Sequence, residues 1–77
     1  MNVQIITPDK ELFSGEADSI VVPGIDGLLG VLNHHAPLLS SLKQGSVKVV
    51  SKKQEQFFEI NGGVVEVLNN NVIILAS

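Results

Sequence analysis

Turn-forming residues interrupt this sequence about every ten residues, and the stretches between them are short and apolar on alternate positions. Val47 and Val49 alternate with Lys48, for example, as the side chains of a half-buried strand do. No stretch carries the three-to-four-residue apolar period of a long helix. The pattern therefore predicts an all-β fold, a compact sandwich or barrel of short strands.

The turn signals divide the chain into a series of predicted strands. A last pair is joined by Asn69–Asn71, residues that tolerate left-handed backbone conformations. We expect strands at residues 2–7, 10–14, 17–22, 38–42, 46–51, 54–60, 64–68 and 72–76, with one more following Gly27. The strand at 17–22 is apolar on both faces of its second half, which predicts a central position.

Leu38, Leu39 and Leu42 follow Pro37, which keeps Ala36 out of helical space. Their spacing fits a helical turn as well as a strand. We predict an extended conformation, in which these leucines anchor the segment in the core.

The composition suits a small β-protein. A chain of 77 residues is one domain, here residues 1–77, which buries roughly 60% of its unfolded surface. Three Phe and no Trp or Tyr leave a core of Val, Ile and Leu, and the β-branched members of that set favour strands.

Several classes of protein are disfavoured by what the sequence lacks. Without cysteine there is neither a disulfide scaffold nor a thiolate metal site. A net charge of −3, with five Lys and no Arg, argues against nucleic-acid partners. No apolar run approaches the ~20 residues of a membrane-spanning helix, so we expect membrane contact only through a partner.

The segment at residues 23–42 holds the most specific pattern. Gly27 is expected at positive φ, where the chain turns into a strand and leaves Leu28 facing outward. Asn33, His34 and His35 then form an exposed loop. The alternative for Leu28 is an inward, ordinary core position.

Catalytic and metal sites find little support here. His34 and His35 have serines nearby in the sequence, but no G-x-S-x-G motif is present. Adjacent histidines diverge on an extended chain, and no third ligand stands at a zinc-site spacing. We expect one histidine to hydrogen-bond within its loop and the other to be solvated.

Two features of the sequence resemble parts of cofactor sites. The glycines at 24, 27 and 30 precede no helix and no Lys-Ser or Lys-Thr pair, so they do not form a phosphate loop. Lys10 lies at a predicted hairpin, as the lysine of a lipoyl or biotinyl carrier does, but its neighbours do not match either carrier. We therefore expect no bound cofactor.

Laid out in order, these motifs resemble one known family, the N-terminal domain of the epsilon subunit of the F-type ATP synthase. The resemblance covers essentially the whole chain, and it is most specific where His-Ala-Pro-Leu-Leu is followed by Gly-Gly-x-x-Glu-Val. The matching segments are 12–17, 22–32, 35–39, 62–67 and 71–76.

The resemblance implies a small antiparallel β-sandwich of about ten short strands. It also implies a non-catalytic rotor subunit of the central stalk, which couples the catalytic head to the membrane c-ring in proton-driven ATP synthesis. Its implied partners are the gamma subunit on one side and the c-ring on the other. Its implied location is peripheral, on the cytoplasmic face of the bacterial inner membrane.

The sequence departs from the family pattern in three places. Leu28 stands where many members carry an acidic residue, and Asn33-His34 replaces a Pro-Gly pair before His35. The sequence ends at Ser77, whereas typical members continue into a helical hairpin that inhibits the enzyme and in some bacteria binds ATP. We therefore expect neither inhibition nor ATP binding from this chain.

These departures lead to a site hypothesis and leave two rival functions. We hypothesise that Leu28, Asn33, His34 and His35 form the interface with the c-ring. The rivals are a cofactor carrier modified at Lys10 and a free-standing ligand-binding β module.

Overall fold

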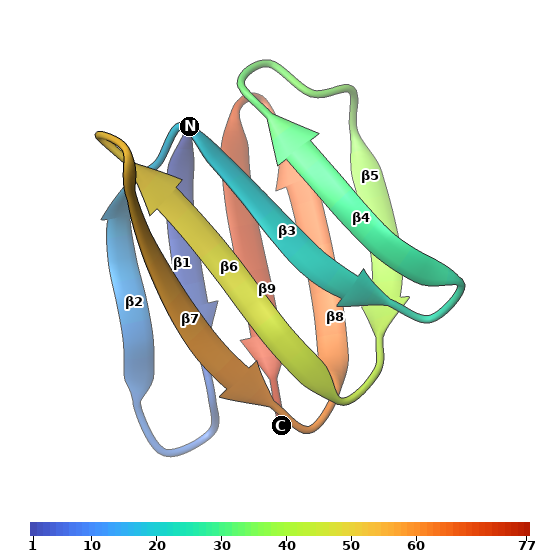
Figure 1. The fold of residues 1–77 in the computed structure, drawn as a ribbon. Coiled ribbons are helices and arrows are strands. Elements are labelled where there is room, and N and C mark those ends of the chain that lie inside the picture. The colour runs from blue at the N-terminus through green and yellow to red at the C-terminus, as the bar shows by residue number, and fades with distance from the viewer.

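The computed structural model describes residues 1–77 as nine strands without a helix (Figure 1). No helix is therefore long and apolar enough to span a membrane. The strands are β1 Asn2–Ile6, β2 Glu11–Glu16, β3 Ser19–Gly24, β4 Gly27–Leu32, β5 Leu38–Leu42, β6 Gly45–Ser51, β7 Gln54–Ile60, β8 Gly63–Leu68 and β9 Asn71–Ala76. The predicted all-β class is confirmed, with nine strands in place of about ten.

The strands form one sheet that folds back on itself into two layers. Its order is β2-β1-β9-β8-β5-β3-β6-β7, and β4 pairs with β3 beside this path. The sheet turns back between β5 and β3, which are joined through the single residue pair Gly24 and Leu42. In Figure 1 the front layer is β4, β3, β6 and β7, and the back layer is β2, β1, β9, β8 and β5.

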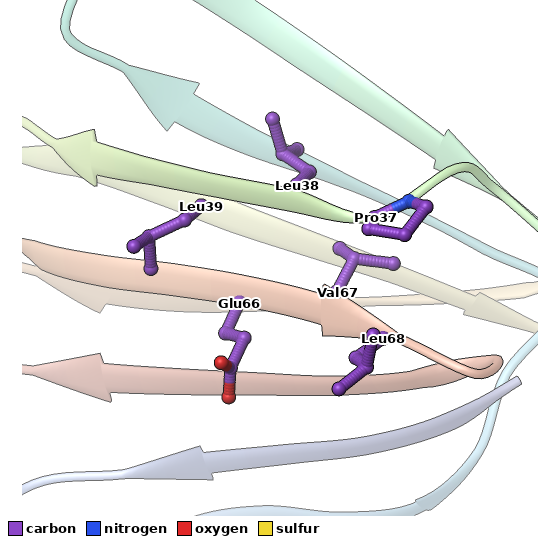
Figure 2. A pocket seen from close by; sticks show the side chains of 6 residues that line it. All are labelled: Pro37, Leu38, Leu39, Glu66, Val67 and Leu68. Carbon is purple, nitrogen blue, oxygen red and sulfur yellow. The ribbon is translucent and has the colours of Figure 1, made fainter.

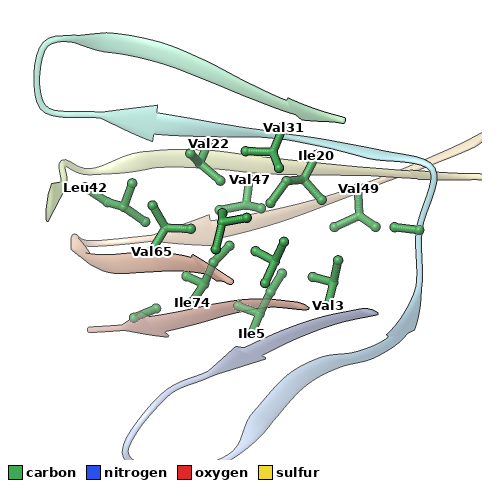
Figure 3. Packing of buried hydrophobic residues seen from close by; sticks show 14 of the residues in the cluster. Val3, Ile5, Ile20, Val22, Val31, Leu42, Val47, Val49, Val65 and Ile74 are labelled. Carbon is green, nitrogen blue, oxygen red and sulfur yellow. The ribbon is translucent and has the colours of Figure 1, made fainter. Parts of the chain in front are cut away.

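A cluster of sixteen buried residues, all hydrophobic, fills the space between the layers (Figure 3). Val3, Ile5 and Ile74 come from the back layer, and Ile20 and Val49 from the front layer. Every strand contributes alternate side chains to this cluster or packs a side chain against it, as the sequence pattern predicted.

The far edges of the two layers meet at β2 and β7. There the rings of Phe13 and Phe58 pack with their centroids 5.7 Å apart and tilted by 57°. This tilted aromatic contact closes the side of the sandwich where no backbone hydrogen bonds join the layers.

The central position predicted for residues 17–22 is confirmed, because β3 pairs with β4 on one edge and with β6 and β5 on the other. The expected antiparallel arrangement holds for every strand pair except one, since β1 and β9 pair in parallel. Parallel neighbours need a long connection, and here the rest of the chain supplies it. Apolar alternation does not report strand direction, so the sequence could not reveal this pairing.

The segment at 38–42 is extended, as predicted, but not all three of its leucines lie in the core. Strand β5 pairs with β8, and successive side chains point to opposite faces. Leu42 is buried and Leu38 is half-buried, whereas Leu39 is 72% exposed. Placing both Leu38 and Leu39 in the core was therefore wrong, because neighbours on one strand cannot share a face.

We predict that Leu42→Ala lowers the free energy of unfolding by about 2–5 kcal/mol, because it opens a cavity in the core. Leu39→Ala is the matched control and should cost less than ~0.5 kcal/mol, as surface substitutions usually do. Urea unfolding followed by circular dichroism measures both. Equal losses for the two variants would contradict the register of β5.

Candidate functional site

The proposed interface residues lie on β4 and on the loop that follows it. The β3–β4 hairpin turns through Ile25 and Asp26, and Gly27 begins β4 with φ of 135°, which confirms the expected positive φ. In the left-handed region a side chain is strained, so glycine suits this position. Gly30 is an ordinary β4 residue opposite Val21.

Leu28 faces outward. It pairs with Pro23 across the hairpin and is 75% exposed, which agrees with the outward prediction and excludes the core alternative. Leu32 lies on the same face of β4, four residues on, and is 67% exposed. Leu32 was not among the predicted interface residues, although its alternation with buried Val31 indicates that it faces outward.

The structure brings Asn33, His34 and His35 together but separates them from Leu28. The loop follows the end of β4, whereas Leu28 lies near its start. At about 3.3 Å per residue, the five residues from Leu28 to Asn33 span roughly 17 Å. The four residues therefore mark an elongated surface, with Leu32 between its two ends. We call the outer face of β4 and this loop the β4 ridge.

The loop is fixed by hydrogen bonds to distant parts of the chain. The amino group of Met1 donates to Oδ1 of Asn33 at 2.5 Å and to the carbonyl of Ala17 at 3.0 Å. The backbone N–H of His34 donates to Oδ1 of Asn70 at 2.8 Å. The loop is thus tied to the start of the chain and to the β8–β9 turn.

The two histidine rings differ in their surroundings. Nδ1 of His35 lies 2.7 Å from the carbonyl oxygen of Ala36, while the His34 side chain is exposed. This matches the expectation of one histidine bonded within the loop and one solvated. Among the serines near the loop in sequence, the Ser40 hydroxyl donates to the Ser41 carbonyl. No group of three or more His, Cys, Asp or Glu lies together.

Lys10 lies in the β1–β2 turn, where its side chain is exposed. The turn is closed by hydrogen bonds to Thr7, whose backbone N–H donates to the Lys10 carbonyl at 2.8 Å. The backbone N–H of Lys10 in turn donates to Oγ1 of Thr7. Lys10 is therefore a solvated turn residue.

The sequence of this chain matches a known protein family. The family described as "ATP synthase, Delta/Epsilon chain, beta-sandwich domain" matches residues 1–77. The ATP synthase epsilon chain of Chlorobium limicola is 47% identical over 74 residues, which cover 95% of this chain and 84% of that protein. The ATP synthase epsilon chain of Desulforamulus reducens is 43% identical over 76 residues, 96% of this chain but only 56% of that protein.

Solved structures share the fold at low sequence identity. A chain from the Tetrahymena thermophila mitochondrial ATP synthase, in a structure of the central stalk and c-ring, matches with a TM-score of 0.84 and 24% identity. The match covers 97% of this chain and 61% of that one. A chain of the Euglena gracilis mitochondrial ATP synthase matches with a TM-score of 0.89 and 22% identity, over 96% and 48% of the two chains.

The backbone of His34 carries a strain that a single substitution relieves. Its φ of 61° lies in the left-handed region, which disfavours residues with a Cβ by roughly 1–2 kcal/mol. We predict that His34→Gly raises the melting temperature by a few degrees, offset in part by the extra freedom of glycine in the unfolded chain. His35→Gly, at a residue without positive φ, should lower it. If differential scanning calorimetry shows a lower melting temperature for both variants, the backbone of His34 is not strained.

Proposed function

Because the chain belongs to the family of the ATP synthase delta/epsilon β-sandwich domain, we propose that it is a non-catalytic rotor subunit. In this role it couples the catalytic head to the membrane c-ring during proton-driven ATP synthesis. The observation that carries the proposal is the family match over residues 1–77, together with relatives named ATP synthase epsilon chain that align over almost all of it.

The proposed partners are the gamma subunit and the c-ring. The Tetrahymena structure is of the central stalk and c-ring, and the Euglena structure is of OSCP, F1 and the c-ring, which supports contact with that part of the synthase. The chain would then lie peripherally at the membrane, on the cytoplasmic face in a bacterium. Its work would pass through protein contacts, without a bound cofactor.

The β4 ridge is the proposed contact with the c-ring. Leu28 and Leu32 extend into solvent from an edge strand, where exposed apolar side chains commonly mark an interaction site. Asn33, His34 and His35 continue this surface past the end of β4. The roughly 17 Å between its ends is compatible with contact along a broad ring rather than with a small pocket.

The contact at Leu28 would be apolar. Covering a leucine of this exposure contributes about 1.5–3 kcal/mol, against 0–1 kcal/mol for an exposed ion pair. Leucine in place of the acid found in many relatives thus need not weaken the contact. Ionic strength should alter it little, because apolar burial is not screened by salt.

The two rival functions are less well supported. A carrier would hold its cofactor on Lys10, and a mass increase on that residue in the purified protein would favour this rival. A free-standing ligand-binding module would have no affinity for the gamma subunit, which a pull-down with purified gamma subunit tests directly.

We predict that Leu28→Asp leaves the melting temperature within a few degrees of the original, because the side chain is exposed, but uncouples the rotor from the ring. ATP-driven proton pumping, measured by fluorescence quenching in inverted membrane vesicles, should fall relative to ATP hydrolysis. Phe57→Asp is the control, since Phe57 is an exposed apolar residue on β7, away from the ridge. Full pumping by the Leu28→Asp enzyme would remove Leu28 from the interface.

A further inference from the structure

The loop that joins β4 to β5, residues 33–37, has little backbone hydrogen bonding of its own. The only hydrogen bond between backbone groups that involves these residues runs from the N–H of His35 to the carbonyl of Leu32 at 3.2 Å. β4 is an edge strand, and it does not pair with β5. The two ends of the loop are therefore not held together by strand pairing, as the ends of a hairpin turn are.

The register of β5 with β8 brings this loop to the β8–β9 turn. Leu38 pairs with Val67, and the two strands are antiparallel. Figure 2 shows Pro37 at the start of β5, close to Val67 of β8, and both residues line the same hollow. The chain before Pro37 and the chain after Leu68 therefore leave the sheet at the same end, and the loop lies beside the turn.

Side-chain oxygens hold the loop in this place. Oδ1 of Asn70, in the β8–β9 turn, accepts the N–H of His34 at 2.8 Å, and Oδ1 of Asn33 accepts from the amino group of Met1. The carbonyl of Asn70 also accepts the N–H of Asn2 at 3.0 Å, so Asn70 is itself fixed to the start of β1. A loop that follows a strand of the front layer is thus tied to the back layer (Figure 1).

The tie to His34 uses only one of two adjacent asparagines. Leu68 pairs with Asn71, so Asn69 and Asn70 form a two-residue hairpin turn with φ of 51° and 62°. Such turns need positive φ at both residues, which asparagine tolerates. At Asn69 the backbone carbonyl accepts a hydrogen bond, from Nδ2 of Asn71 at 3.1 Å. Turn formation accounts for both asparagines, but it does not account for the bond between the Asn70 side chain and the loop.

We propose that Asn70 is a positioning residue for the β4 ridge, and that its amide oxygen holds the Asn33–His35 loop in the conformation that meets the partner. The inference rests on the proposed function, in which that partner is the c-ring. A loop that is free to move must be ordered on binding, and this ordering costs conformational entropy. A loop that is already tied to the back layer avoids that cost.

Hydrogen exchange of the His34 amide, measured by NMR on the free chain, tests the tie itself. Asn70→Gly removes the acceptor but suits positive φ, so exchange at His34 should become about tenfold faster while the melting temperature stays within a few degrees. Asn69→Gly is the matched control, because it makes the same backbone change in the same turn and keeps the acceptor. Its exchange at His34 should equal that of the wild-type chain. Asn70→Asp retains an acceptor oxygen and should restore slow exchange.

The positioning role is tested in the assembled synthase, by ATP-driven proton pumping relative to ATP hydrolysis in inverted membrane vesicles. Asn70→Gly should lower this ratio, whereas Asn69→Gly and Asn70→Asp should keep the wild-type ratio. A general weakening of the turn would instead lower the ratio in both glycine variants, and that result would overturn the proposal.

The remaining outcomes separate this proposal from the proposed function. Unchanged exchange at His34 in the Asn70→Gly chain would show that the loop is held without Asn70. Faster exchange with full pumping would remove the positioning role and leave the proposed function intact. If a synthase that lacks the chain pumps as well as the complete enzyme, the proposed function is wrong, and the positioning role with it.

Discussion

The fold depends on one apolar cluster, shared by two layers whose strands pair with each other only at the corner between β3 and β5. All sixteen members of the cluster are hydrophobic, and no polar or charged residue is buried. Directional interactions therefore do little to hold the layers together, and the apolar area removed from water does most of the work. Since each strand has two faces and the cluster can use only one, the same alternation decides which side chains are left outside.

The side chains left outside are unevenly distributed over the two layers. On the front layer, apolar residues stand along the edge strand β4, and β3 separates them from the ion pair of Lys48 and Glu55 on β6 and β7. On the back layer they form a patch over β5, β8 and β9 with a single carboxylate inside it.

Alternation and turn chemistry predicted most of the strands, the central place of β3 and the outward direction of Leu28. They could not supply what depends on pairing. The parallel contact of β1 with β9 and the outward side of Leu39 follow from registers between strands far apart in the sequence. The four proposed interface residues were near neighbours in the sequence, yet an extended strand places Leu28 a strand's length from the Asn33–His35 loop.

The central claim is that the β4 ridge becomes covered when the chain joins the rotor. Hydroxyl-radical footprinting of the free chain and of the chain assembled with gamma subunit and c-ring measures this directly, residue by residue. We expect protection of Leu28 and Leu32, with Phe57 oxidised equally in both states. Oxidation of Leu28 and Leu32 that is unchanged by assembly would contradict the account.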